Sequence, residues 1–115
     1  MVDSINSTAL SGLYAAEQRI SVSADNIANV NTPNFRAKDV VQVSQEAGGV
    51  ATQVVDRNPA TVPAPTTDGG TQQLPNVSLD QELVKTQTAS YDYQANLKVI
   101  KTERDLTKSL LDIQA

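Results

Sequence analysis

Apolar residues near the N-terminus recur with alternating gaps of four and three positions. The series runs through residues 4–31, and Ser23 fills its one polar slot. Its members are Ala9, Leu13, Ala16, Ile20, Ile27 and Val30. A repeat of about 3.5 residues draws a narrow stripe along one side of a helix. The pattern predicts an N-terminal helix that ends at Thr32-Pro33, because the residue before a proline avoids helical backbone.

A second, longer stripe occupies residues 78–113, which contain neither Pro nor Gly. It consists of Leu79, Leu83, Thr86, Ser90, Tyr93, Leu97 and Ile100, followed by Leu106, Leu110 and Ile113. Ser78 and Gln81 match a capping box, in which the Ser78 hydroxyl accepts from the Gln81 backbone N–H. At 1.5 Å per residue this helix would be roughly 50 Å long. A compact chain of this size is only roughly 30 Å across, so the helix needs partners outside its own fold.

The middle of the chain differs from both ends. Two valine-rich runs, 39–44 and 50–55, flank Gly48-Gly49 and predict a small β-hairpin. Residues 58–75 are rich in Pro, Gly and Thr, and Pro59 is the first of their prolines. This composition predicts an extended linker.

These segments predict a mainly α fold, in which two long terminal helices pair as a coiled coil. A short β-hairpin and an extended linker lie between them. The expected divisions are residues 1–34, 35–77 and 78–115. One seam between two helices cannot cover all the apolar residues, and exposed apolar strips usually mark an interaction surface. We therefore expect the helices to order when they pack into a larger bundle.

The amino-acid composition limits the kinds of function that the chain can have. The chain has 115 residues with no Cys and no His, three Tyr, one Phe and a net charge of −4. It lacks a basic patch for nucleic acid and an apolar run that would span a bilayer. The first residues carry no basic cluster or unbroken apolar stretch of a cleaved signal peptide. The acidic pairs Asp80/Glu82 and Glu103/Asp105 have no His, Cys or converging third acid, so we interpret them as solvated helix faces. We predict no enzyme activity, cofactor, metal or small-molecule substrate.

Two separate stretches carry a family resemblance. Residues 13–20 and 25–35, which end in Asn-Thr-Pro-Asn-Phe, closely resemble the N-terminal signature of the flagellar basal-body rod and hook proteins. Residues 81–84 and 93–102 resemble the C-terminal helix of the same family. The short middle region and residues 36–41 are most similar to proximal-rod subunits of the C type.

The resemblance implies a structural subunit of the flagellar rod, which polymerises by helix packing into a helical tube that crosses the periplasm and transmits torque. It implies export through the flagellar type III apparatus without a cleaved signal. The implied partners are copies of the chain and other rod proteins. A small helical-hairpin export chaperone or adaptor is the alternative, and it predicts a discrete dimer instead of a polymer.

The stripes and the resemblance together predict the assembly residues. The expected interface comprises Leu13, Ile20, Ile27, Phe35, Leu83, Tyr91, Tyr93, Leu97, Ile100 and Leu106. The turn motif comprises Asn26, Asn29, Asn31, Thr32 and Pro33. Its asparagines either cap the turn or bond to neighbouring subunits. Tyr93 is expected to be buried and Tyr91 to meet a neighbour.

Overall fold

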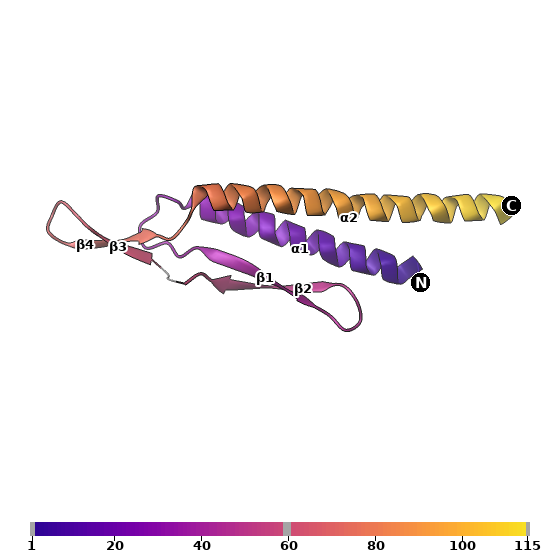
Figure 1. The fold of residues 1–115 in the computed structure, drawn as a ribbon, viewed down its shortest axis with the longest axis horizontal. Helices are drawn as coiled ribbons and strands as arrows, with labels where there is room; N and C mark the ends of the chain where they lie inside the picture. The colour runs from indigo at the N-terminus through magenta and orange to yellow at the C-terminus, as the bar shows by residue number, and fades with distance from the viewer. Residues whose placement is uncertain (1, 59–60, 115) are drawn as a thin grey trace.

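Two long antiparallel helices form the body of the molecule. A computed structural model describes residues 2–58 and 61–114 and places α1 (Val2–Ala28) beside α2 (Leu79–Gln114). Two small β-hairpins lie between them in the sequence (Figure 1). The molecule measures 79 × 25 × 14 Å. The predicted pair of terminal helices is confirmed, and its elongated shape leaves little interior in which to build a core.

The two helices approach closely because small residues line their seam. Ala9, Ala16 and Ala89 are buried. A Cβ atom added at Gly12 would lie only 2.7 Å from the side-chain nitrogen and oxygen of Asn96. Asn96 is held in place there, since its Nδ2 donates to the Asp92 carbonyl at 2.9 Å. Gly12 therefore lies where a larger side chain would collide with Asn96, and the helices diverge from each other toward the start of α1 (Figure 1).

α1 ends before the predicted boundary. The helix ends at Ala28 instead of continuing to residue 31. The Val30 backbone N–H donates to the Ile27 carbonyl at 3.2 Å, which tightens the last turn into a shorter loop of hydrogen bonds. Asn34 then adopts a φ of 65°, the left-handed conformation that asparagine tolerates in turns. The turn thus begins in the asparagine-rich segment, upstream of the Pro33 stop.

The predicted β-hairpin is confirmed. β1 (Lys38–Ser44) pairs antiparallel with β2 (Val50–Asp56) in a register that places Ser44 opposite Val50. Gly48 and Gly49 form its turn with φ values of 95° and 89°. The hairpin packs against α1, where the Val50 backbone N–H donates to Ser11 Oγ at 3.1 Å. This contact supplies the support that an isolated hairpin lacks in water.

A second hairpin replaces part of the expected linker. β3 (Thr61–Pro65) pairs antiparallel with β4 (Thr71–Pro75). The prolines and glycines that predicted a linker are compatible with this ribbon, because both strands are edge strands, where proline is tolerated. Pro59, on which the linker prediction also rested, lies outside the described residues.

The start of α2 is capped by a different residue from the one predicted. Gln81 donates its backbone N–H to Asp80 Oδ1 at 3.0 Å, and Ser78 Oγ donates to the same oxygen at 2.5 Å. The predicted bond from Gln81 to the Ser78 hydroxyl is therefore wrong. A carboxylate is the stronger acceptor at this positive end of the helix dipole. The Ser78 hydroxyl, followed by the Gln81 N–H, lowers the pKa of Asp80.

The close approach at Gly12 yields a prediction. Gly12→Leu should lower the free energy of unfolding by roughly 1–3 kcal/mol, because the new side chain displaces Asn96 from the seam. Urea denaturation followed by circular dichroism measures this loss. Asn96→Ala should restore part of it, whereas Ser7→Leu on the exposed side of α1 should have little effect. Equal losses with and without Asn96 would contradict the close-packing explanation.

Candidate assembly interface

The predicted residues of α1 lie mostly within the subunit. Leu13 is 7% exposed and belongs to the core. Ile20 and Ile27 are half-buried along the same helix, and Phe35 is half-buried after the turn. These side chains stabilise the subunit itself, and only their remaining surface is available to a neighbour.

The predicted residues of α2 divide into two sets. Tyr93 and Ile100 are half-buried. The remaining four are exposed: Leu83 55%, Tyr91 61%, Leu97 44% and Leu106 60%. The fully buried side chains on this helix are instead Glu82 and Ala89. The buried positions of α2 are therefore small or polar, and most of its large apolar side chains are exposed.

The end of α2 carries an unpaired apolar segment. The helix extends beyond the start of α1 (Figure 1), and its exposed leucines include Leu106, Leu110 and Leu111. Beside them, Ile5, Val99 and Leu106 line a groove of about 480 Å³ between the two helices. In the described part of the chain, neither helix combines the length and apolarity needed to cross a membrane. Exposed apolar surface of this extent on a mixed-charge helix suits contact with another protein.

The turn motif acts largely within the chain. Asn26 is fully buried, its Nδ2 donates to the Lys38 carbonyl at 2.8 Å, and its Oδ1 accepts the Lys38 N–H at 3.0 Å. Asn29 accepts from the Thr32 hydroxyl at 3.1 Å and donates to the Asp25 carbonyl at 2.8 Å. The Asn26 side chain thus makes the two backbone hydrogen bonds to Lys38 that a neighbouring strand would otherwise make to this edge of β1. Three motif residues are exposed: Asn31, Thr32 and Pro33.

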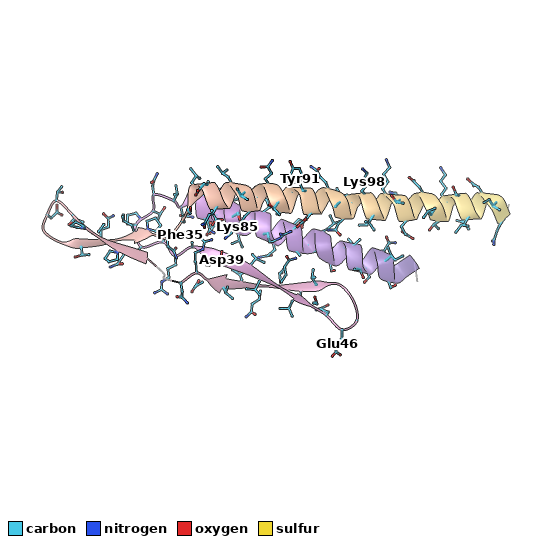
Figure 2. The ribbon with its side chains drawn as sticks, viewed as in Figure 1. Phe35, Asp39, Glu46, Lys85, Tyr91 and Lys98 are labelled. Carbon is cyan, nitrogen blue, oxygen red and sulfur yellow. The ribbon has the colours of Figure 1, made fainter. Side chains whose placement is uncertain are left out.

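One arginine joins the helices to the middle of the chain. Arg57, directly after β2, forms a two-bond contact with Asp39 of β1, with Nη2–Oδ1 2.7 Å and Nε–Oδ2 3.1 Å. Its Nη2 also lies 2.6 Å from Glu82 Oε1 of α2, and its Nη1 donates to the Asn76 carbonyl at 3.2 Å. Lys85 Nζ reaches Asp39 at 2.9 Å from the next turn of α2 (Figure 2). We call these residues the Arg57 junction.

Glu82 is the most constrained member of the junction. Its side chain is 0% exposed, and Oε2 has no hydrogen-bond partner among the described residues. The expectation that Glu82 belongs to a solvated helix face is wrong. A buried carboxylate that keeps its charge requires a cation, and Arg57, with a side chain only 16% exposed, provides it.

The junction shifts the ionisation of two members. The Arg57 guanidinium lowers the pKa of Asp39 from 3.8 to about 2, against the opposing effect of partial burial, and Lys85 adds to the shift. Asp39, and secondarily Glu82, raise the pKa of Arg57. Asp39 and Arg57 therefore keep their charges throughout the neutral range.

Neither Arg57 nor Asp39 is recognisable from the sequence as a junction residue. They are 18 positions apart, Asp39 on β1 and Arg57 directly after β2, and Glu82 lies another 25 positions on. An isolated Arg between a strand and a proline-rich segment was the one available signal. In the described part of the chain no group of three or more acidic, His or Cys residues could hold a metal ion. The arrangement can hold elements together and present an apolar surface.

Comparison with known families covers both helices. Residues 7–36 match the family described as "Flagella basal body rod protein". Residues 69–113 match "Flagellar basal body rod FlgEFG protein C-terminal". The matches cover most of α1 with its turn, and β4 with nearly all of α2.

Individual relatives align over nearly the whole chain. The chain is 36% identical to the flagellar basal-body rod protein FlgC of Yersinia enterocolitica over 121 aligned positions, which cover 90% of each chain. It is 33% identical to the FlgC proteins of Escherichia coli O6:H1 and of Salmonella typhimurium, again over 90% of each chain. The similarity therefore includes the middle region as well as the two helices.

The buried carboxylate makes the junction sensitive to loss of its cation. Arg57→Met should lower the free energy of unfolding by about 3–5 kcal/mol, because it leaves the buried Glu82 with only the longer 3.8 Å ion pair to Lys85. Glu82→Gln in the same chain should recover much of this loss, since an amide carries no charge. A double-mutant cycle by urea denaturation measures the coupling. Additive losses would show that the two residues act independently.

The pKa of Asp39 sets an acid-dependent contribution to stability. The pKa is lower in the folded chain, so between about pH 4 and pH 2 the unfolded chain binds more protons. The stabilisation by Asp39 is therefore complete above this window and is lost as the pH falls through it. Asp39→Asn should flatten the pH dependence of thermal unfolding in this range. Glu46→Gln, at the exposed turn of the first hairpin, is the matched control and should retain the wild-type slope.

Proposed function

The chain belongs to the flagellar basal-body rod protein family, and on this premise we propose that it is a structural subunit of the rod that polymerises through its terminal helices. The observation that carries the proposal is the orientation of α2. Its buried positions are small or polar, and most of its large apolar side chains are exposed. Packing of these side chains against neighbouring subunits would remove apolar surface from water and stabilise the polymer.

The finer assignments follow from this geometry and the family. We propose that residues 1–34 and 78–115 form the helical wall of a tube that crosses the periplasm, and that residues 35–77 contact its neighbours. Copies of this chain and other rod proteins are the proposed partners. The proposed export route is the flagellar type III apparatus. The mechanical role is torque transmission through packed helices, and the Arg57 junction keeps the middle region fixed to them.

The interface residues of α2 have distinct proposed roles. Leu83, Tyr91, Leu97 and Leu106 present their exposed side chains to neighbouring subunits. Tyr93 and Ile100 contribute the edge of the same surface from the seam. Leu13, Ile20, Ile27 and Phe35 support the interface from within the subunit by fixing α1 and the turn.

Polymerisation provides the test. The purified chain should form elongated, concentration-dependent assemblies in sedimentation and electron microscopy. Leu106→Glu should prevent or strongly weaken assembly, because it places a charge on the exposed apolar surface. Ser109→Glu introduces the same charge at an exposed polar position of the same helix and should have a much smaller effect. A discrete dimer at all concentrations, unaffected by Leu106→Glu, would instead support an adaptor.

A further inference from the structure

The second hairpin is attached to the subunit at its base and extends away from the helix pair. β3 and β4 project away from the helix pair (Figure 1), and within the described chain they pack against no other helix or strand. A two-stranded hairpin without a packing partner is marginally stable in water. The first hairpin differs, because it rests on α1. The β3–β4 hairpin is tied at its base to the turn after α1, where the Asn34 backbone N–H donates to the Gln73 carbonyl at 2.8 Å. A surface on another molecule would stabilise the part beyond this contact.

The tip of this hairpin carries a single charge. Asp68 is the only charged residue between Thr61 and Pro75. It is exposed, and its carboxylate accepts a long hydrogen bond of 3.4 Å from the Thr67 hydroxyl. The tip thus presents one carboxylate and neighbouring threonine methyl groups.

A cleft elsewhere on the subunit is complementary to this tip in charge. It lies between α1, β1 and α2, has a volume of about 410 Å³, and includes Val22, Val40 and Val84 in its lining. Three cations also line it, Arg19, Lys38 and Lys85. The single acid in the lining, Asp39, is already paired with Lys85 and Arg57.

Among the three cations that line the cleft, Lys38 is the one available to bind an acidic group from another molecule. Arg19 is ion-paired with Asp92, and Lys85 with Asp39. Lys38 is exposed, and its ammonium group forms no ion pair with the described residues. The cleft is cationic on a chain whose net charge is −4, so it is a local site for an acidic group.

We propose that the β3–β4 tip of one copy docks in the cleft of a second copy, with Asp68 paired to Lys38. This inference rests on the proposed function and names one of its subunit contacts. The hairpin projects away from its own helices, so the partner must be another molecule (Figure 1). Two different surfaces meet, and a contact of this heterologous type propagates into a ring or an open helical array instead of closing a two-fold dimer.

Charge reversal tests the pairing. Asp68→Lys should raise the critical concentration for assembly by roughly tenfold or more, because it brings a cation to a cationic cleft. Lys38→Glu in the same chain should restore assembly. Glu46→Lys reverses the same charge at the tip of the other hairpin, which is held on α1, and should assemble as the wild type does. If the wild type polymerises and the Asp68→Lys variant assembles equally well, this contact is overturned and the proposed function is left intact.

Cysteine pairing tests the contact independently of polymerisation. The chain contains no Cys, so introduced thiols have no background. Asp68→Cys mixed with Lys38→Cys should give disulfide-linked pairs on mild oxidation. Glu46→Cys mixed with Lys38→Cys is the control and should give few. Equal yields from the two mixtures would exclude a preferred contact between the tip and the cleft, whether or not the wild type polymerises. Absence of polymers with preferential pairing would instead count against the proposed rod function.

Discussion

The ion pair between Arg57 and Glu82 fixes the middle of the chain to the helices. Removing a carboxylate from water costs several kcal/mol unless a cation accompanies it, and Glu82 is fully buried in the first turn of α2. The guanidinium is planar and its donors point in set directions. When it pairs with Glu82, its remaining donors bind Asp39 and the Asn76 carbonyl. One side chain therefore sets the position of β1, the end of β2 and the approach to α2.

The seam between the helices has a second consequence for the surface. Gly12 and its alanine neighbours allow close approach, but they bury little apolar area. The larger side chains of α2 are then available for contacts between molecules. In the proposed polymer, these side chains would be buried between subunits, which would supply hydrophobic stabilisation that the helix seam lacks.

Periodicity and turn chemistry predicted the elements well, and side-chain direction less well. The two helices and the first hairpin follow from residue spacing and from Gly48-Gly49. The stripe through Leu83 and Leu97 did not reveal which part of it faces α1, because periodicity fixes a face but not its partner. The second hairpin was missed because its prolines argued against strands. An edge strand, which pairs with only one other strand, tolerates proline. Glu82 was assigned to solvent because its cation, Arg57, lies 25 positions earlier in the sequence, after β2.

Local composition cannot reveal such long-range pairs, whereas family resemblance can identify the assembly. The Asn-rich turn shows both effects. Its sequence indicated the family, yet the role of Asn26 became clear only from its two hydrogen bonds to the Lys38 backbone. A side chain that bonds to backbone many positions away leaves no periodic pattern in the sequence. Its role becomes visible only in the three-dimensional structure, where the two segments lie side by side.

The pairing of Arg19 with Asp92 also indicates which contacts form early and which form late during folding. These residues are 73 positions apart, whereas each hairpin joins strands that are close in the sequence. Contacts of large sequence separation form late, since the entropy of closing the intervening loop opposes them. The hairpins can thus form while α2 is still incomplete, and the helix seam must wait for nearly the whole chain. If the chain emerges gradually, α1 cannot pack against α2 until α2 has emerged. The seam between the two helices would then be the last part of the subunit to form.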